Sequence, residues 1–192
     1  MSQPVLICRP GERGEALAAA LRERGESVES LNVMQLEALP ETPEMRRIWL
    51  DIDQYHKIIV ISPFAATCLS EALDRFWPQL PIGIDYYSVG SATAATLYDQ
   101  LGVRVHVPAP SAGEDTSEAL LALASLQQLA HQRILLVAGE GGRPLLAETL
   151  AERGAQVTRV AVYRRTFHPL EPALQTRLCS GNYRALIVTS SE

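Results

Sequence analysis

A short apolar run, an amphipathic stretch and a glycine follow one another several times along this chain of 192 residues. The apolar runs are rich in Val, Ile and Leu without polar alternation, which is typical of parallel strands covered on both faces. The amphipathic stretches predict helices, and three of them end directly before a glycine, which favours a helix C-terminus. This alternation predicts an α/β fold with parallel sheets. The predicted strands are Pro4–Cys8, Ser27–Leu31, Lys57–Ser62, Asp85–Val89, Arg104–Val107, Arg133–Ala138, Gln156–Val162 and Arg184–Thr189, and the predicted helices are Gly14–Arg24, Pro63–Phe76, Ser91–Leu101 and Pro144–Arg153.

The sequence also contains two pairs of similar segments. The segment Ile7–Val33 aligns with Leu136–Val162 at an offset of 129 residues, and Tyr55–Phe64 aligns with Tyr183–Glu192 at an offset of 128. Two segments at nearly the same offset indicate an internal duplication. The alternative is that any βα unit tends to carry Leu, Gly and Arg at similar places. The identical residues of the first alignment, in the numbering of its first copy, are Leu17, Ala18, Leu21, Glu23, Arg24, Gly25, Val28 and Val33.

The duplication predicts a longer protein. The second copy stops at Thr189–Glu192, where the first copy enters the helix Pro63–Phe76. In a parallel sheet, the elements that correspond to residues 65–128 would complete the second core. We therefore expect the natural protein to continue for about sixty residues, by extrapolation of the repeat. We expect the chain as given to be inactive, because one domain would lack part of its core.

Composition excludes several classes of protein. The net charge is −5 and the basic residues are scattered, whereas a nucleic-acid surface needs clustered Lys and Arg. The cysteines Cys8, Cys68 and Cys179 have neither the spacing of a zinc site nor that of a disulfide framework. The sequence has no secretory signal and no apolar run near the roughly 20 residues of a membrane span. These features predict a cytoplasmic protein without metal that binds neither membrane nor nucleic acid.

Small hydroxyl residues follow the predicted strands at three places. Ser62 comes before Pro63, Ser91 follows Gly90 with Thr93 in the next turn, and Ser190 closes the chain's last apolar run. Simple helix capping explains such serines one at a time. Taken together they indicate a binding site, because ligands of open α/β sheets bind at the carboxyl ends of the strands. Helix N-termini there favour anions, including carboxylates.

Two further segments have alternative interpretations. The stretch from Val137 to Arg143 is rich in glycine, but it is not a dinucleotide fingerprint in register, and a tight turn before the helix at Pro144 explains it. Tyr163 follows a predicted strand and precedes the linker-like stretch His168–Pro172. Its phenol either points into a cleft between domains, as donor and acceptor, or packs beside the linker.

These pieces, in this order, resemble the uroporphyrinogen-III synthase family over essentially the whole chain. The matched segments are Val5–Pro10 before Leu17, Leu21 and Gly25, then Ile59–Pro63, Ser88–Ala94, Val137–Gly139 with Gly142, Arg143, Leu146, Leu150 and Gly154, then Val162–Tyr163, and Val188–Ser190. The resemblance implies two flavodoxin-like parallel-sheet domains joined by a two-stranded linker, with the active site in the cleft. The discontinuous domain would comprise residues 1–36 and 168–192, incomplete at the C-terminus, and the inserted domain residues 37–167.

The resemblance also implies a reaction and its residues. The enzyme would be a cofactor-independent lyase of heme and other tetrapyrrole biosynthesis, which cyclises hydroxymethylbilane to uroporphyrinogen III with loss of water and inversion of ring D. Tyr163 would be the catalytic acid. A monomer in transient contact with the preceding pathway enzyme is expected. The residues implied to bind the substrate are Arg9, Ser62, Gly90, Ser91, Thr93, Gly139 and Ser190.

This sequence departs from the family pattern at two positions. Phe64 stands where a polar or basic residue is common, and Cys8 where threonine is common. A different class of function stays open as the alternative: a two-domain, non-catalytic binding or sensor module that closes around a small acidic ligand. A nucleotide-dependent transferase is disfavoured, because no clean phosphate loop is present.

Overall fold

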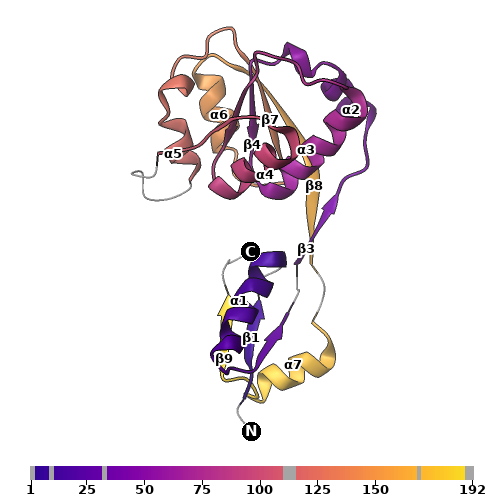
Figure 1. Cartoon of the computed structure of the whole chain (residues 1–192), viewed down its shortest axis with the longest axis vertical. Coiled ribbons are helices and arrows are strands. Elements are labelled where there is room, and N and C mark those ends of the chain that lie inside the picture. The colour runs from indigo at the N-terminus through magenta and orange to yellow at the C-terminus, as the bar shows by residue number, and fades with distance from the viewer. Residues whose placement is uncertain (1–2, 9–10, 32–33, 110–115, 168–169, 189–192) are drawn as a thin grey trace. The chain divides into compact units, whose positions relative to one another are not determined.

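A computed structural model describes residues 3–8, 11–31, 34–109, 116–167 and 170–188, with side chains for all of these except 11–13. The chain divides into two compact units (Figure 1): unit 1 comprises residues 1–36 and 165–192, and unit 2 comprises residues 37–164. The chain passes between the units twice, at residues 36–37 within strand β3 and at residues 164–165 within strand β8. The domain boundary predicted from the sequence for the second crossing was 167–168, three residues after the observed one.

The predicted α/β fold with parallel sheets is confirmed. Unit 1 holds a three-stranded sheet in the order β2-β1-β9, and a six-stranded sheet has the order β3-β8-β7-β4-β5-β6. The strand pairs β8-β7, β7-β4, β4-β5 and β5-β6 are all parallel. The strands are β1 (Val5–Cys8), β2 (Val28–Ser30), β3 (Met34–Ala38), β4 (Lys57–Val60), β5 (Asp85–Ser88), β6 (Val105–His106), β7 (Arg133–Gly139), β8 (Gln156–Phe167) and β9 (Ala185–Val188). The helices are α1 (Gly11–Glu23), α2 (Pro43–Leu50), α3 (Pro63–Phe76), α4 (Ser91–Leu101), α5 (Ser117–Leu121), α6 (Leu145–Glu152) and α7 (Pro172–Cys179), with short 3₁₀ turns at Ile52–Gln54 and Ala124–Leu126.

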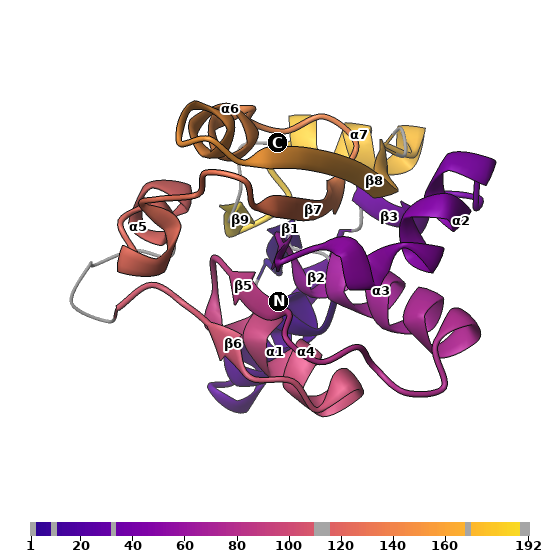
Figure 2. The same cartoon turned by 90° about the horizontal axis from the view of Figure 1, so that it is seen from above.

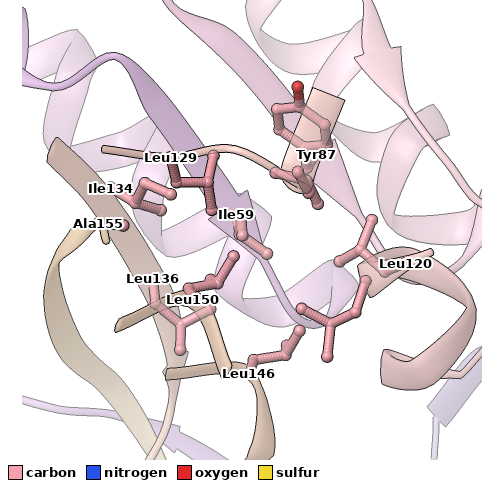
Figure 3. Close-up of a cluster of buried hydrophobic side chains, with 11 residues drawn as sticks. Ile59, Tyr87, Leu120, Leu129, Ile134, Leu136, Leu146, Leu150 and Ala155 are labelled. Atoms are coloured by element: carbon pink, nitrogen blue, oxygen red, sulfur yellow. The ribbon is translucent and has the colours of Figure 1, made fainter. Parts of the chain in front are cut away.

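Helices cover both faces of the sheet in unit 2. Figures 1 and 2 show α2, α3 and α4 on one face and α5 and α6 on the other. Successive residues of a strand point to opposite faces, so each inner strand contributes to two cores. This explains why β4 is buried along its whole length and why its sequence lacks polar alternation. The core on the α5–α6 face (Figure 3) consists of Ile59, Tyr87, Leu120, Leu121, Leu126, Leu129, Ile134, Leu136, Leu146, Leu150 and Ala155.

The strand pairings support the internal duplication. In unit 1, Val5 of β1 pairs with Val28 of β2, and in unit 2, Ile134 of β7 pairs with Val157 of β8, 129 residues further on in both strands. The strand on the other side of β1 also has a counterpart. Strand β9 pairs with β1 in the same register in which β4 pairs with β7. The arrangement β2-β1-β9 therefore corresponds to β8-β7-β4. At the same offset of 129, the counterpart of Tyr163 in unit 1 is Met34.

Five elements differ from the sequence-based expectation, one of them the short helix α5, which was not predicted. Strand β3 and helix α2 were not predicted, because β3 is largely exposed and its residues lack an apolar run. Helix α7 begins at Pro172, inside the stretch expected to be a linker, and it buries no side chain that would have given an apolar pattern. Strand β8 continues to Phe167, so the prediction that Tyr163 follows a strand was wrong: Tyr163 lies within it.

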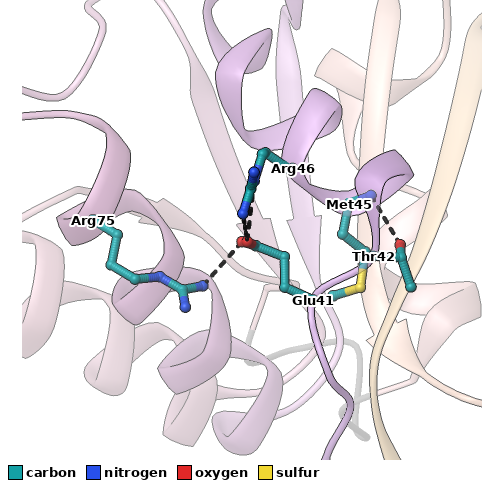
Figure 4. A network of polar contacts seen from close by, with 5 residues as sticks. All are labelled: Glu41, Thr42, Met45, Arg46 and Arg75. Carbon is teal, nitrogen blue, oxygen red and sulfur yellow. Dashed lines mark hydrogen bonds and ion pairs between the residues drawn. The ribbon is translucent and has the colours of Figure 1, made fainter.

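Glu41 connects the segment after β3 to two helices of unit 2 (Figure 4). Its carboxylate accepts hydrogen bonds from Arg46 of α2, at 3.4 Å, and from Arg75 of α3, at 3.2 Å. The neighbouring Thr42 caps α2, since its Oγ1 accepts from the backbone N–H of Met45 at 3.2 Å and Pro43 occupies the first turn. These contacts tie the start of α2 to α3.

In unit 1 we expect a pH-dependent contribution from Glu29. Its carboxylate accepts from Tyr183 Oη at 2.6 Å and from Arg177 Nη2 at 2.8 Å, and these two hydrogen bonds lower the pKa of Glu29. A lowered folded-state pKa stabilises the fold above the ordinary pKa of the carboxyl, and this stability is lost as the pH falls through the lowered value. Glu29→Gln should therefore cost at most about 1 kcal/mol of unfolding free energy at neutral pH.

The measurement is thermal unfolding of Glu29→Gln and the unchanged protein between pH 7 and pH 3. The difference between their melting temperatures should shrink below the ordinary pKa of 4.5. Glu23→Gln, at an exposed residue of the same unit, is the control and should show no such trend. A difference that stays constant down to pH 3 would contradict this role of Glu29.

Candidate active site

The carboxyl ends of four parallel strands meet at one edge of the sheet in unit 2. Ser62 follows β4, Gly90 and Ser91 follow β5, Gly139 ends β7, and Tyr163 lies in β8 beside it. All of them were predicted as site residues from the sequence. Because β8, β7, β4 and β5 are consecutive in the sheet, the fold brings these residues to the same edge.

Ser62 forms the N-cap of helix α3. Its backbone is extended, with φ −145° and ψ 162°, and its Oγ accepts a hydrogen bond from the backbone N–H of Ala65 at 3.2 Å. Pro63 occupies the first helical position, where the missing N–H costs nothing. The same Oγ lies 3.0 Å from the phenolic oxygen of Tyr163, on the other side of β7. The capping predicted for Ser62 therefore occurs together with a contact to the predicted catalytic tyrosine.

Strand β8 has a β-bulge directly before Tyr163. Ala138 pairs with Ala161 but Gly139 pairs with Tyr163, so β8 has one extra residue, Val162. A bulge of this kind interrupts the alternation of side chains between the two faces of the sheet, so the direction of Tyr163 does not follow from simple alternation. Val162 and Tyr163 are both buried, and Tyr163 is 3% exposed. The sequence could not reveal this, because a bulge depends on the pairing with a distant strand.

Gly139 leaves the space that the tyrosine ring occupies. A Cβ atom at this position would lie 2.6 Å from Cζ and 2.7 Å from Cε2 of Tyr163, which is closer than such atoms approach. The φ angle of Gly139 is not positive, so the space and not the backbone conformation requires glycine here. By contrast, Gly141 and Gly142 have φ of 73° and 85°, and they form the tight turn that was predicted before α6.

Two further residues support this site: Arg159 binds the loop after β7, and Phe64 contacts the ring of Tyr163. Arg159 Nη2 donates to the carbonyl oxygen of Gly139 at 2.7 Å and also to that of Gly141, so it holds the β7–α6 loop. Phe64, in the first turn of α3, places its ring against that of Tyr163 at 5.2 Å and an interplanar angle of 79°. Neither role was predicted. An arginine within a strand carries no local signal for its carbonyl contacts, and Phe64 stood out only as a departure from a family pattern.

The β5–α4 junction differs from that of Ser62. Gly90 is the N-cap of α4 and offers no side-chain cap, and its carbonyl oxygen accepts from Ser88 Oγ at 2.9 Å. Ser91 is exposed at the start of the helix, whereas the Thr93 side chain is 3% exposed and faces the interior. Gly90 and Ser91 can therefore meet a ligand directly. Two predicted substrate-binding residues, Arg9 and Ser190, lie outside the described residues.

Burial keeps the Tyr86 phenol and the Cys68 thiol of unit 2 protonated. Burial raises the pKa of Tyr86 to about 12, so its phenol stays protonated at neutral pH. Burial, with a smaller effect of the Glu71 carboxylate, raises the pKa of the Cys68 thiol on α3. A neutral thiol is a poor nucleophile, so Cys68 is no candidate for covalent catalysis.

Within the ranges that the structure describes, no group of three or more His, Cys, Asp or Glu side chains is arranged to hold a metal ion. In the same part of the chain, no helix is both long and apolar enough to cross a membrane.

Comparison with known proteins identifies the relatives of this chain. Residues 15–192 match the family model of uroporphyrinogen-III synthase HemD. The uroporphyrinogen-III synthase of Salmonella typhimurium is 32% identical over 189 residues, which cover 98% of this chain and 76% of that protein. The Escherichia coli enzyme is 31% identical, with the same coverage of both chains. The chain belongs to the uroporphyrinogen-III synthase family.

Solved structures agree with this assignment. A mutant uroporphyrinogen III synthase of Thermus thermophilus has a TM-score of 0.68 at 25% identity, covering 95% of this chain and 71% of that one. The enzyme of Helicobacter pylori, at 15% identity and a TM-score of 0.53, shares the fold, covering 92% of this chain and 68% of that one. Uroporphyrinogen-III synthases are two-domain α/β proteins and cyclising lyases of heme biosynthesis. Each relative is named as an enzyme, which favours catalysis over the alternative of a binding or sensor module.

Proposed function

We propose that the gene product that contains this chain acts on hydroxymethylbilane as a uroporphyrinogen-III synthase, closing the linear tetrapyrrole with loss of water and inversion of ring D. The observation that carries the proposal is the phenol of Tyr163, held 3.0 Å from Ser62 Oγ at the carboxyl edge of the sheet in a member of this family. A phenol is both a donor and an acceptor of protons, and such a group is what the departure of a hydroxyl as water requires.

In the first step, Tyr163 would donate its proton to the hydroxyl of the substrate. The carbon–oxygen bond breaks and the oxygen departs as water. The lone pair of the pyrrole nitrogen delocalises onto the carbon left behind, which gives an azafulvenium cation. The cation is then attacked through ring D, and the resulting spiro intermediate opens and closes again with ring D inverted. The proton lost in the final closure returns to the tyrosine oxygen, so the catalyst is regenerated.

The eight carboxylates of this substrate would meet helix N-termini and not a basic surface. The N-termini of α3 and α4 carry Ser62, Gly90 and Ser91 at the sheet edge, and backbone N–H groups there favour anions. Arg9, Thr93, Gly139 and Ser190 belong to the same proposed set, with Thr93 acting from within the first turn of α4 and Gly139 through its backbone. A net charge of −5 is compatible with such a site, because no cluster of Lys and Arg is needed.

Positioning would be the main contribution of the protein. The substrate closes unaided to the isomer with ring D not inverted, so the enzyme must hold one folded geometry in which ring D reacts at the correct carbon. We further propose that the protein is a cytoplasmic monomer that receives the unstable substrate through transient contact with the preceding enzyme of the pathway.

The test is the isomer composition of the product. The gene product that contains this chain is mixed with enzymatically generated hydroxymethylbilane, and the oxidised products are separated chromatographically into type I and type III uroporphyrin. Type III above the spontaneous type I background is the expected result. Type I alone, from protein with the circular dichroism spectrum of a folded α/β protein, would refute the proposed activity.

A further inference from the structure

The hydroxyl of Ser62 has one hydrogen and two lone pairs, and the structure gives this oxygen two hydrogen-bond contacts. One lone pair accepts the N–H of Ala65, at 3.2 Å, and caps helix α3. The other contact of this oxygen is with the phenolic oxygen of Tyr163, at 3.0 Å, where either group can be the donor. The direction of this second hydrogen bond decides which proton remains free.

We propose that Ser62 is a positioning residue for the reaction: it donates its hydrogen to the phenolic oxygen of Tyr163, which leaves the phenol's own hydrogen free for the departing hydroxyl of the substrate. This inference rests on the proposed function. Once Tyr163 has given up its proton, its oxygen can only accept hydrogen bonds. The hydrogen bond must then run from Ser62, so a bond that already has this direction needs no reorganisation during proton transfer.

Helix α3 adds to this effect. The phenolic oxygen lies beside the N-cap of a 14-residue helix, whose N-terminus carries a partial positive charge. The negative charge that develops on the tyrosine oxygen therefore forms next to a hydrogen-bond donor and the positive end of a dipole. The Tyr163 ring packs closely against Gly139 and makes an edge-type contact with Phe64. This packing restricts the ring to the orientation in which its oxygen meets Ser62.

The experiment uses Ser62→Gly, which removes the hydroxyl but keeps a residue that is tolerated at an N-cap. We expect kcat for type III formation to fall about tenfold, the value of one hydrogen bond of about 1.4 kcal/mol, with KM unchanged. Ser62→Thr, which keeps the hydroxyl and the cap, should restore kcat to within about threefold of the original. If Ser62→Gly raised KM and left kcat unchanged, the inference would be overturned, because the Ser62 side chain would then contact the substrate directly.

Thr42→Gly is the matched control for capping. Thr42 caps α2 as Ser62 caps α3, with a proline next and the same 3.2 Å contact to the N–H three residues on. Among the described residues, no tyrosine bonds to the Thr42 hydroxyl. We expect Thr42→Gly to lower thermal stability less than Ser62→Gly, which also loses the hydrogen bond to Tyr163, and to leave kcat unchanged. Equal losses of kcat in the two variants would assign the effect to helix capping and overturn the positioning role.

A double-mutant cycle with Tyr163→Phe completes the test. If Ser62 acts through the phenol, Ser62→Gly should have almost no further effect on the rate in the Tyr163→Phe background. A tenfold loss in both backgrounds overturns the positioning role while leaving the synthase activity established. A starting protein that forms only type I product would instead overturn the proposed function and the inference with it.

Discussion

Replacing Tyr163 with phenylalanine is expected to lower kcat for type III formation by about 10²- to 10⁴-fold, the range typical of a general acid. The ring remains, so its edge contact with Phe64 and its packing over Gly139 are kept. Only the phenolic oxygen and its 3.0 Å contact with Ser62 are lost, which should cost about 1 kcal/mol of stability. The protein therefore stays folded, and the loss of rate reports chemistry. Steady-state kinetics over a range of substrate concentrations should place the effect in kcat.

Tyr98→Phe is the matched control for this variant. Tyr98 also lies in unit 2, on helix α4, but its side chain is 66% exposed and away from the sheet edge. We expect its kcat to be unchanged. If Tyr163→Phe kept more than half of the original kcat, the proton donor would have to be another group or the substrate itself.

The second large effect is expected for Gly139→Ala. The added Cβ would lie 2.6 Å from Tyr163 Cζ, so the ring must shift from the position in which its hydroxyl lies 3.0 Å from Ser62. Overpacking of this kind costs about 1–3 kcal/mol of stability. Displacing a catalytic group by about 1 Å can lower the rate about 10²-fold. We therefore expect a destabilised but folded protein with a rate close to that of Tyr163→Phe.

Removing the ring of Tyr163 separates the predicted loss of stability from the predicted loss of rate. In a Tyr163→Ala background the added methyl of Gly139→Ala meets no ring, so its cost in melting temperature should largely disappear. The activity should stay low in both single variants and in the double variant. If Gly139→Ala cost the same stability with and without the ring, a contact other than the Tyr163 ring would explain the glycine.

The parts of the site that follow local rules could be predicted from the sequence. Ser62 before Pro63 predicted a helix start, and Gly102 after Leu101 predicted a helix end; the structure confirms both, with Gly102 at φ 67°. The duplication was visible because the same βα unit recurs with the same spacing, and the strand registers repeat it. The helix start and the helix end depend on residues within one or two turns of each other, and the duplication on a comparison of two such local patterns.

The rest depends on contacts between distant strands. Gly139 was interpreted as part of a turn, whereas its neighbour across the sheet, Tyr163, is the reason for glycine there. The bulge at Val162 and the carbonyl contacts of Arg159 arise from the pairing of β7 with β8, which no window of sequence contains. Thr93 matched a family segment, but which face of α4 it occupies became clear only from its burial.

The most direct test is a single-turnover reaction with the gene product that contains this chain in excess over hydroxymethylbilane. The type III fraction is measured for the unchanged protein and for Tyr163→Phe side by side. We expect the unchanged protein to form type III almost exclusively. In Tyr163→Phe, spontaneous closure should outpace the slowed enzymatic step and give mainly type I. Type III in equal proportion from both proteins would contradict the role of Tyr163, and type I from both would contradict the proposed function itself.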